Sequence, residues 1–288
     1  MAVWYVFASP AFRLMASYYL IRGVFLAILV NLSCIKEFDY ETETCLIMSL
    51  LAHLKQRYQE EQFHPSLLAL LCNPFYFARA GLRDAILLFA SRLSGRLLDV
   101  GCGSQPYRRY FQKQEYVGLD LDTEANRQAG VADYFYDGSC FPFPDASYDA
   151  VLCNQVLEHV FNPEEFLAEI RRVLKPGGRL LLTVPFVWDE HEQPYDCARY
   201  TSFGLHHLFE QQGLRWLEHR KLGNDASILF QLTNAYLFKV ASRLPRRWFL
   251  LFSVTVMAAV NFFGVIARSI LPNNNDLFLD HVVLAEKT

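Results

Sequence analysis

The sequence predicts an α/β protein with a doubly wound, mostly parallel sheet. Three observations support this fold class: short apolar runs, helix-like segments between them, and proline or glycine at the junctions. The chain has 288 residues, of which 52% are hydrophobic, so it is long enough to bury a full core around such a sheet.

The predicted elements alternate along the chain from residue 95 onward. Strands are expected at 96–100, 116–121, 131–136, 148–153, 179–184, 214–220 and 279–285. Helices fit between most of them, at 106–113, 123–129, 163–174 and 202–212. Pro163 marks the start of the third of these helices, and Gly177 with Gly178 marks its stop.

Composition argues against several classes of function. The net charge of −3 gives no general reason to expect a nucleic-acid partner. The seven cysteines are scattered with no CxxC pair, which argues against a disulfide framework and suits reduced thiols in the cytoplasm. No histidine or cysteine pair has ligand spacing with an adequate third partner, so no metal is expected.

Two segments precede the predicted sheet. Residues 1–47 are expected to be an apolar N-terminal extension that touches a membrane or lies upstream of a translation start at Met48. A signal peptide is the alternative, although no small-residue cleavage site is obvious. The uncharged stretch after Arg22 is too short to span a bilayer. Residues 48–94 are expected to be a helical lead-in, with Asn73 as the N-cap of a helix that begins at Pro74. The main domain, 95–288, carries an apolar insertion at 225–275.

Within this insertion, residues 248–267 contain no charged side chain. At about 1.5 Å per residue, a helix of this length could cross a bilayer core of about 30 Å. A single crossing would leave the last strand on the wrong side of the membrane. We therefore expect the segment to lie in the membrane interface, with Arg243, Arg246 and Arg247 available to anionic head groups. A buried core helix or a dimer face is the alternative, and the oligomeric state is left open.

The stretch "LLDVGCGSQPY" (97–107) places an acid and two glycines at the end of a buried strand. In a doubly wound sheet, ligands bind beyond the carboxyl ends of the strands. Gly101 and Gly103 would let the backbone approach a ligand closely. Pro106 stands where the dinucleotide fingerprint has its third glycine, which counts against a nicotinamide cofactor.

Later strand ends carry further polar residues. Asp120 ends the second strand and can accept hydrogen bonds from ribose hydroxyls. Asp137 follows the third strand, where it could accept from an exocyclic amine while Phe141 and Phe143 offer apolar surface to a purine. Asn154 lies at the end of the fourth strand.

Four segments together resemble the successive motifs of the class I S-adenosylmethionine-dependent methyltransferases, in the branch of the ubiquinone-type enzymes. They are "LLDVGCG", "YVGLDLD", "DGSCFPFPDASYDAVLCNQVLEHV" and "EEFLAEIRRVLKPGGRLLLTVP". The resemblance implies a Rossmann-like, seven-stranded sheet with an antiparallel last strand, and S-adenosyl-L-methionine as cofactor. It places Asp99, Gly101 and Gly103 around the methionine moiety, Asp120 at the ribose, Asp137 and Gly138 at the adenine, and the backbone of Asn154 near the sulfonium. Cys102 and Leu121 complete the predicted cofactor-binding set.

The loop after the fifth strand, 185–214, is dense in polar side chains at the edge where an acceptor must arrive. His191, Tyr195 and Asp196 are the candidate catalytic residues, because a histidine or carboxylate near a hydroxyl acceptor can remove its proton. The other acceptor-side candidates are Glu192, Arg199 and Tyr200. A solvated loop in which Asp196 and Arg199 merely pair is the alternative. His159 can be read as a base or as a structural residue of its motif.

The segment "PYDCARYTSFGL" resembles one found in methyltransferases associated with bacterial glycan and lipopolysaccharide clusters. We therefore predict a cytoplasmic, peripherally membrane-bound methyltransferase that acts on a saccharide or lipid-linked acceptor. Two alternatives stay open: a methyltransferase for a quinone-like small metabolite, and a noncatalytic membrane-associated protein that retains the fold. Oxygen, nitrogen and carbon are all open as the methylated atom.

Overall fold

The computed structural model describes residues 52–53 and 55–288, and the extension expected at 1–47 lies outside the described residues. The described chain divides into two units. The first unit contains residues 80–229 and 266–288, and the second contains the described residues up to Arg79 together with 230–265. The boundaries between them fall inside three helices: α5 (Tyr76–Ala90), α9 (Ser227–Ala241) and α11 (Ala258–Ile270).

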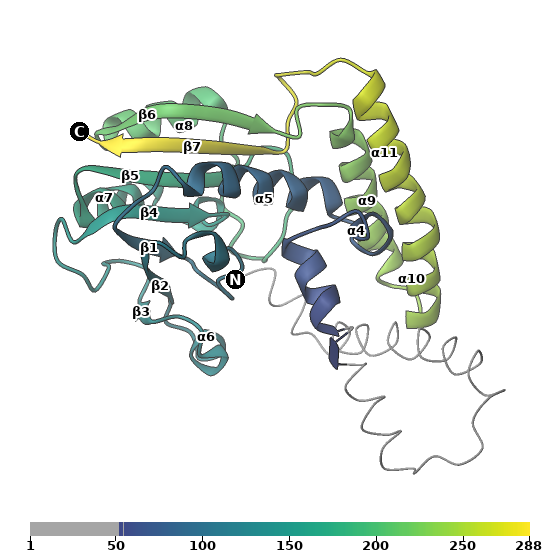
Figure 1. Cartoon of the computed structure of the whole chain (residues 1–288), viewed down its shortest axis with the longest axis horizontal. Coiled ribbons are helices and arrows are strands. Elements are labelled where there is room, and N and C mark those ends of the chain that lie inside the picture. The colour runs from purple at the N-terminus through teal and green to yellow at the C-terminus, as the bar shows by residue number, and fades with distance from the viewer. Residues whose placement is uncertain (1–51, 54) are drawn as a thin grey trace, which may run out of the picture. The chain divides into compact units, whose positions relative to one another are not determined.

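The first unit is built on a seven-stranded sheet of order β3-β2-β1-β4-β5-β7-β6. The strands are β1 (Arg96–Val100), β2 (Glu115–Leu121), β3 (Tyr134–Tyr136), β4 (Tyr148–Asn154), β5 (Leu174–Pro185), β6 (Leu214–Leu222) and β7 (Asp280–Lys287). β1 to β5 pair in parallel, whereas β7 is antiparallel to both β5 and β6 (Figure 1). The predicted sheet with its antiparallel last strand is confirmed.

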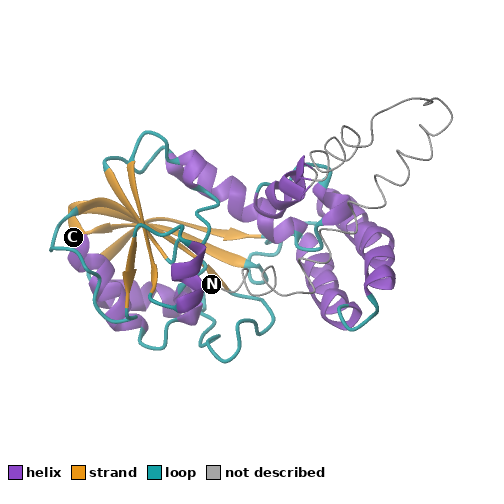
Figure 2. Cartoon of the chain, turned by 90° about the horizontal axis from the view of Figure 1, so that it is seen from below, coloured by secondary structure: helices purple, strands orange, loops and turns teal. Residues whose placement is uncertain are grey.

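Helices cover both faces of this sheet (Figure 2). Because side chains alternate along a strand, Leu98 and Val100 enter one core while Leu97 enters the other. The first core also holds residues of α7 (Pro163–Val173) and α8 (Ser202–Gln211), and the second holds residues of α5. The short helix α6 (Glu124–Ala129) follows β2 and is capped by Thr123, whose hydroxyl accepts from the Asn126 amide.

Three of the predicted elements were wrong in extent. The strand expected at 131–136 is only the three residues of β3, Tyr134–Tyr136. The helix expected at 106–113 is only a 3₁₀ turn, η1 (Arg108–Tyr110), because the chain turns again at Phe111 to enter β2. β5 begins at Leu174, directly after α7, so the glycine pair at 177–178 is an irregularity inside the strand and not the loop that follows a helix. Gly177 has φ 74°, and a Cβ on Gly178 would lie 2.8 Å from the Lys175 carbonyl oxygen, so both positions suit glycine.

The helix expected from Pro74 begins at Tyr76 as α5. Asn73 still uses its side chain at this helix start, since its Oδ1 accepts from the Phe75 amide at 2.9 Å. The second unit also contains helical residues 55–63, α4 (Ala69–Cys72), α10 (Arg246–Phe252) and a π-helical segment, η3 (Ser253–Met257).

Buried amide side chains complete the helix ends of the second unit. Gln231 Oε1 accepts from the amides of Phe77 and Ala78 in the first turn of α5. Asn261 Nδ2 donates to the carbonyls of Leu70 and Asn73, at the end of α4, at 3.0 Å each. Helix ends leave such backbone groups without intrahelical partners, so these side chains replace the water that burial excludes.

One helix of the described chain, Arg246–Ile270, is long and apolar enough to cross a membrane by length and composition, and 39% of its most apolar window is buried. Its buried positions within the second unit, Ser253, Met257, Asn261 and Gly264, recur every three or four residues. The packing is tight at Gly264, where a Cβ would lie 2.6 Å from the ring of Phe77. The helix therefore has one face packed against protein.

Candidate active site at the carboxyl edge of the sheet

The residues expected to bind the cofactor lie at the carboxyl ends of four adjacent parallel strands, β3, β2, β1 and β4. Asp99 is the next-to-last residue of β1, and Gly101, Cys102 and Gly103 form the turn after it; Asp120 and Leu121 end β2; Asp137 and Gly138 follow β3; Asn154 ends β4. The fold thus brings residues spread over more than fifty positions to one edge, where doubly wound sheets bind their ligands.

The turn after β1 is held by backbone hydrogen bonds and shaped by glycine. The amides of Gly101 and Cys102 donate to the Leu119 carbonyl at 2.9 and 3.1 Å. Gly101 has φ 69°, and a Cβ there would lie 2.5 Å from a Val156 methyl group, so a larger residue would strain the turn. Gly103 has φ 49°, and a Cβ would meet nothing within 4 Å, so this side of the turn is open.

The Asp120 carboxylate ties β2 to that turn. Its Oδ2 accepts from the Gly103 amide at 3.0 Å, and its Oδ1 accepts from the Leu121 amide at 2.8 Å. The side chain is buried, yet each carboxylate oxygen has a second acceptor position. Asp120 is therefore suited to fix the turn and to accept hydrogen bonds from ribose hydroxyls.

Asp99 lies in β1, two residues before Gly101. Its carboxyl group is buried and accepts a hydrogen bond from the Tyr116 hydroxyl. Burial raises the pKa of Asp99 to about 7; the Tyr116 hydrogen bond works against this rise, and the nearby charge of Asp120 adds to it. A cationic group placed beside this carboxyl would favour its ionised form. The ammonium group of a methionine moiety is such a cation.

At the β3 end, Asp137 is exposed and its Oδ1 accepts from the amide of Ser139 at 2.9 Å and from the hydroxyl of the same residue. These hydrogen bonds lower the pKa of Asp137 and keep it ionised. Gly138 has φ 92°, and a Cβ there would lie 3.4 Å from Leu121 Cδ2. Leu121 is exposed, so it offers apolar surface beside the acid.

Phe141 does not offer the purine surface expected from the sequence. Its ring is buried in the first core, edge-on to Tyr136 at 5.1 Å and to Phe166 at 5.9 Å between ring centroids. The expectation for Phe141 was wrong because strand-end spacing does not say which way a side chain turns. Phe143 likewise packs against Tyr148.

The end of β4 presents backbone to the site. Asn154 Oδ1 accepts from the Thr183 hydroxyl of β5 at 2.8 Å, so the Asn154 side chain is engaged inside the sheet. Gln155 has φ 55°, a left-handed conformation that costs free energy in a residue other than glycine. Its amide donates to the Thr183 carbonyl at 3.0 Å.

In the loop after β5, Asp196 and Arg199 form a two-point ion pair, with N–O distances of 2.6 and 2.7 Å. The carboxylate also accepts from the His191 amide at 3.0 Å. Burial raises the pKa of Asp196, but the hydrogen bonds from Arg199 and the His191 amide outweigh it, so the pKa is lowered. Asp196 therefore holds the loop in shape, while the Tyr195 side chain is 69% exposed.

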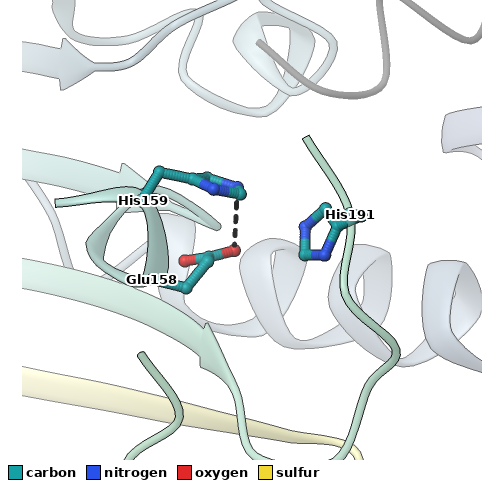
Figure 3. A group of neighbouring side chains, drawn as sticks. All are labelled: Glu158, His159 and His191. Atoms are coloured by element: carbon teal, nitrogen blue, oxygen red, sulfur yellow. Dashed lines mark ion pairs between the residues drawn. The ribbon is translucent and has the colours of Figure 1, made fainter. Parts of the chain in front are cut away.

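His191 lies beside Glu158, which the sequence had not singled out, and His159, which the sequence had left open as a base or a structural residue (Figure 3). Both belong to η2 (Leu157–His159), just after β4. His159 Nε2 lies 3.7 Å from Glu158 Oε1, and the two imidazole centroids are 4.9 Å apart. The signal for Glu158 was its place in "LEHV", four residues past the end of β4 and next to His159, because that position is at the same edge.

The three groups have perturbed pKa values for one main reason. Burial raises the pKa of Glu158 to about 8 and lowers that of His159 to about 4, with His191 as a second cause for the latter. Burial also lowers the pKa of His191. Clusters of perturbed groups at a strand edge are typical of functional sites.

A surface depression of about 540 Å³ lies elsewhere, at the amino edge of the parallel strands. Arg171, Gly213 and Lys287 are among its lining residues. None of the expected cofactor or acceptor residues lines it, so it is not the site described above.

The cofactor half of the site coincides with a known domain family. Residues 98–182 match the family model described as "Methyltransferase domain", and this range contains every residue expected to bind the cofactor. These residues form a methyltransferase domain. The open side of Gly103 and the acids at Asp99 and Asp120 fit S-adenosylmethionine, the cofactor of this class.

Three curated relatives of the methyltransferase domain are similar in sequence. Two are from Mycolicibacterium smegmatis. "Fatty-acid O-methyltransferase" is 37% identical, over 31% of this chain and 36% of its own length. "Probable S-adenosylmethionine-dependent methyltransferase" is 36% identical, over 33% of this chain and 40% of its own length. The third, a "Ubiquinone/menaquinone biosynthesis C-methyltransferase" from a Ruegeria species, is 34% identical, over 35% and 46%. The chain spans less than half the length of these relatives.

The buried carboxyl of Asp99 predicts a pH-dependent stability. In the folded chain the Asp99 carboxyl keeps its proton up to about pH 7, whereas in the unfolded chain it releases the proton near pH 3.8. The contribution of this group to the free energy of unfolding is therefore full at low pH and is lost as the pH rises to about 7. We expect Asp99→Asn to match the native chain near pH 4 and to be more stable at pH 8, by at most about 4 kcal/mol.

Urea unfolding of both chains between pH 4 and pH 8, without cofactor, measures this difference. Asp122→Asn is the control, because Asp122 is exposed and paired with Arg127. A stability difference between Asp99→Asn and the native chain that stays constant with pH would contradict the assignment.

Proposed function

We propose that this chain transfers the methyl group of S-adenosylmethionine to an acceptor at the carboxyl edge of its sheet. The observation that carries the proposal is the gathering of Asp99, the Gly101–Gly103 turn, Asp120, Asp137 and Asn154 at that edge, within residues that match a methyltransferase domain. The cofactor supplies a sulfonium-bound methyl group that is already activated for displacement. The task left to the protein is to hold and align the two reactants.

Each part of the edge has a distinct role in this proposal. The Asp99 carboxylate binds the methionine ammonium, which favours the ionised form of an acid whose pKa burial has raised. Asp120 accepts from the ribose hydroxyls while it fixes the turn, and Leu121 and Gly138 flank the adenine. The backbone at Asn154 and Gln155 lies at the end of β4, which pairs with β5, the strand that leads into the loop proposed to receive the acceptor.

Cofactor binding tests this assignment. Calorimetry is expected to show that the chain binds S-adenosylmethionine and its demethylated product more tightly than NAD. Asp120→Ala is expected to weaken binding of S-adenosylmethionine by about 10-fold or more, because hydrogen bonds to a charged group are worth about 1.5–3 kcal/mol.

Asp122→Ala is the matched control for Asp120→Ala. It removes a neighbouring acid that is exposed and paired with Arg127, so cofactor affinity should not change. Tighter binding of NAD, or equal affinities in the two variants, would rule out the proposed assignment.

The proposed acceptor is a saccharide or a lipid-linked saccharide. The polar loop after β5 supports a hydroxyl-rich acceptor, since Tyr195 is exposed there and the Asp196–Arg199 pair keeps the loop in place. The resemblance of residues 194–205 to methyltransferases of glycan clusters points the same way. A quinone-like acceptor is the second candidate, favoured by the relative that is named for quinone biosynthesis.

Mass analysis distinguishes these acceptors. With a cofactor that carries a deuterated methyl group and an extract of the cell envelope, we expect the label in saccharide-containing products. His191→Ala should lower the turnover and leave the cofactor affinity nearly unchanged, because His191 lies in the acceptor loop. Label found only in quinone-like metabolites would overturn the saccharide assignment in favour of the second candidate.

We also propose that the helix at 246–270 rests in the interface of an anionic membrane. Within the second unit, Trp248, Leu251, Phe262 and Phe263 are exposed, whereas Ser253, Met257, Asn261 and Gly264 are buried. This division suits a helix that lies flat, with protein on one side and lipid on the other. The arginines at 243 and 247 are exposed and the one at 246 is half-buried, and each can add about 1 kcal/mol of attraction to an anionic surface.

Liposome sedimentation tests the membrane proposal. The chain should bind anionic vesicles more than neutral ones, and salt should weaken the binding because it screens exposed charges. Glutamine at Arg243, Arg246 and Arg247 should reduce it by at least about 10-fold.

The matched control removes the same charge from the first unit, by placing glutamine at Arg127, Arg215 and Arg220. These three side chains are exposed and paired with acids of the sheet unit, so binding should fall less. Binding that resists salt and alkaline extraction, with one terminus protected from protease, would instead indicate a spanning helix. If the chain sediments with neither anionic nor neutral vesicles, the proposal that the exposed face of this helix contacts lipid is wrong.

A further inference from the structure

The cluster at the ends of β4 and β5 offers two nitrogen donors and one oxygen donor to a common point. Ligand atoms from Glu158, His159 and His191 all lie within 4.8 Å of one another (Figure 3). In a tetrahedral zinc site with bonds of about 2.0–2.2 Å, ligand atoms lie about 3.4 Å apart. The distance of 3.7 Å between His159 Nε2 and Glu158 Oε1 is close to this value.

In each imidazole ring, Nδ1 contacts a backbone carbonyl oxygen, and metal-binding histidines usually make such a contact through the nitrogen that does not bind the metal. His159 Nδ1 lies 3.1 Å from the Tyr195 carbonyl oxygen, and His191 Nδ1 lies 3.1 Å from the Asp189 carbonyl oxygen. A carbonyl can only accept, so each Nδ1 carries the proton and each neutral ring keeps a lone pair on Nε2. The donors are therefore in the tautomer that a cation requires.

Glu158 supplies the second, independent observation. Its side chain is fully buried, and neither carboxylate oxygen has a hydrogen-bond partner within residues 52–53 and 55–288. A buried carboxylate without hydrogen bonds is costly unless a cation accompanies it. The Glu158 carbonyl accepts from the amides of Cys197 and Ala198 at 2.8 and 3.1 Å, which holds the acceptor loop against η2.

We propose that Glu158, His159 and His191 bind one divalent transition-metal ion, with zinc as the best match to two imidazoles and one carboxylate. Three protein ligands leave a coordination position for an outside molecule, as in catalytic zinc sites. The expectation of no metal considered only spacing along the chain, whereas these ligands meet through the loop after β5.

The role of the ion in catalysis rests on the proposed function. The proposal that the three residues bind an ion does not depend on it. An acceptor hydroxyl bound to the ion loses its proton to solvent more readily. The oxygen lone pair then forms the new bond to the methyl carbon, and the bond between sulfur and that carbon breaks with its electron pair left on sulfur. The site thus favours an oxygen acceptor, and a hydroxyl of a saccharide satisfies this chemistry.

Cobalt binding tests the site without any acceptor. The full chain, treated with a chelator and dialysed, is titrated with Co²⁺, and visible d–d absorption reports four-coordinate binding. We expect one ion per chain, with affinity lowered more than about 10-fold in Glu158→Gln and in His191→Gln. Zn²⁺ should displace the Co²⁺ signal and raise the Tm of the native chain.

His206→Gln is the matched control, since His206 is a half-exposed imidazole on α8 that lies 3.4 Å from Glu210. It should bind Co²⁺ as the native chain does. Absence of Co²⁺ binding in the native chain, or equal binding in Glu158→Gln, His191→Gln and the native chain, would overturn the proposal.

Calorimetry with S-adenosylmethionine on the same samples separates this proposal from the proposed function and shows that the variants are folded. Cofactor binding without metal binding would overturn the metal site alone. Metal binding without cofactor binding would overturn the methyltransferase assignment and support the metal site.

Discussion

The carboxylate of Asp120 is the interaction on which the cofactor edge depends. With one oxygen on the Gly103 amide and the other on the Leu121 amide, it joins the turn after β1 to the end of β2. The Leu119 carbonyl adds a second connection there, since it accepts from the amides of Gly101 and Cys102. The glycines make the turn sharp, but the acid determines where the turn lies. The same residue therefore serves both the shape of the edge and the recognition of a ligand.

A second anchor builds the acceptor side from a segment with no regular structure. The Asp196 carboxylate, which is paired with Arg199, accepts a hydrogen bond from the His191 amide. Further along the loop, the amides of Cys197 and Ala198 donate to the Glu158 carbonyl. These contacts connect the loop after β5 to the 3₁₀ turn after β4. The consequence is that a histidine from the loop lies beside a glutamate and a histidine from the turn. Loops positioned by a rigid sheet commonly carry function in this way.

The sequence was sufficient for the features that local pattern controls. Apolar runs predicted each strand, and the order of strand ends predicted that the acids and glycines would meet at one edge. It failed where the outcome depends on side-chain direction or on a loop. Phe141 turned inward because its ring fits against Tyr136, and the helix after β1 shrank to a turn because the chain must reverse at Phe111. The neighbours of His191 could not be inferred, because more than thirty residues separate it from His159.

The helix at 246–270 shows how polar residues in an apolar segment can be interpreted. Asn261 and Gly264 both lie on its buried face. Asn261 donates to two backbone carbonyls at the end of α4, and Gly264 lets the ring of Phe77 approach. These two residues therefore mark the side of the helix that contacts protein, while the exposed aromatic residues mark the other side. Mean hydropathy alone does not separate the two faces, since it averages around the helix; the position of the few polar residues does.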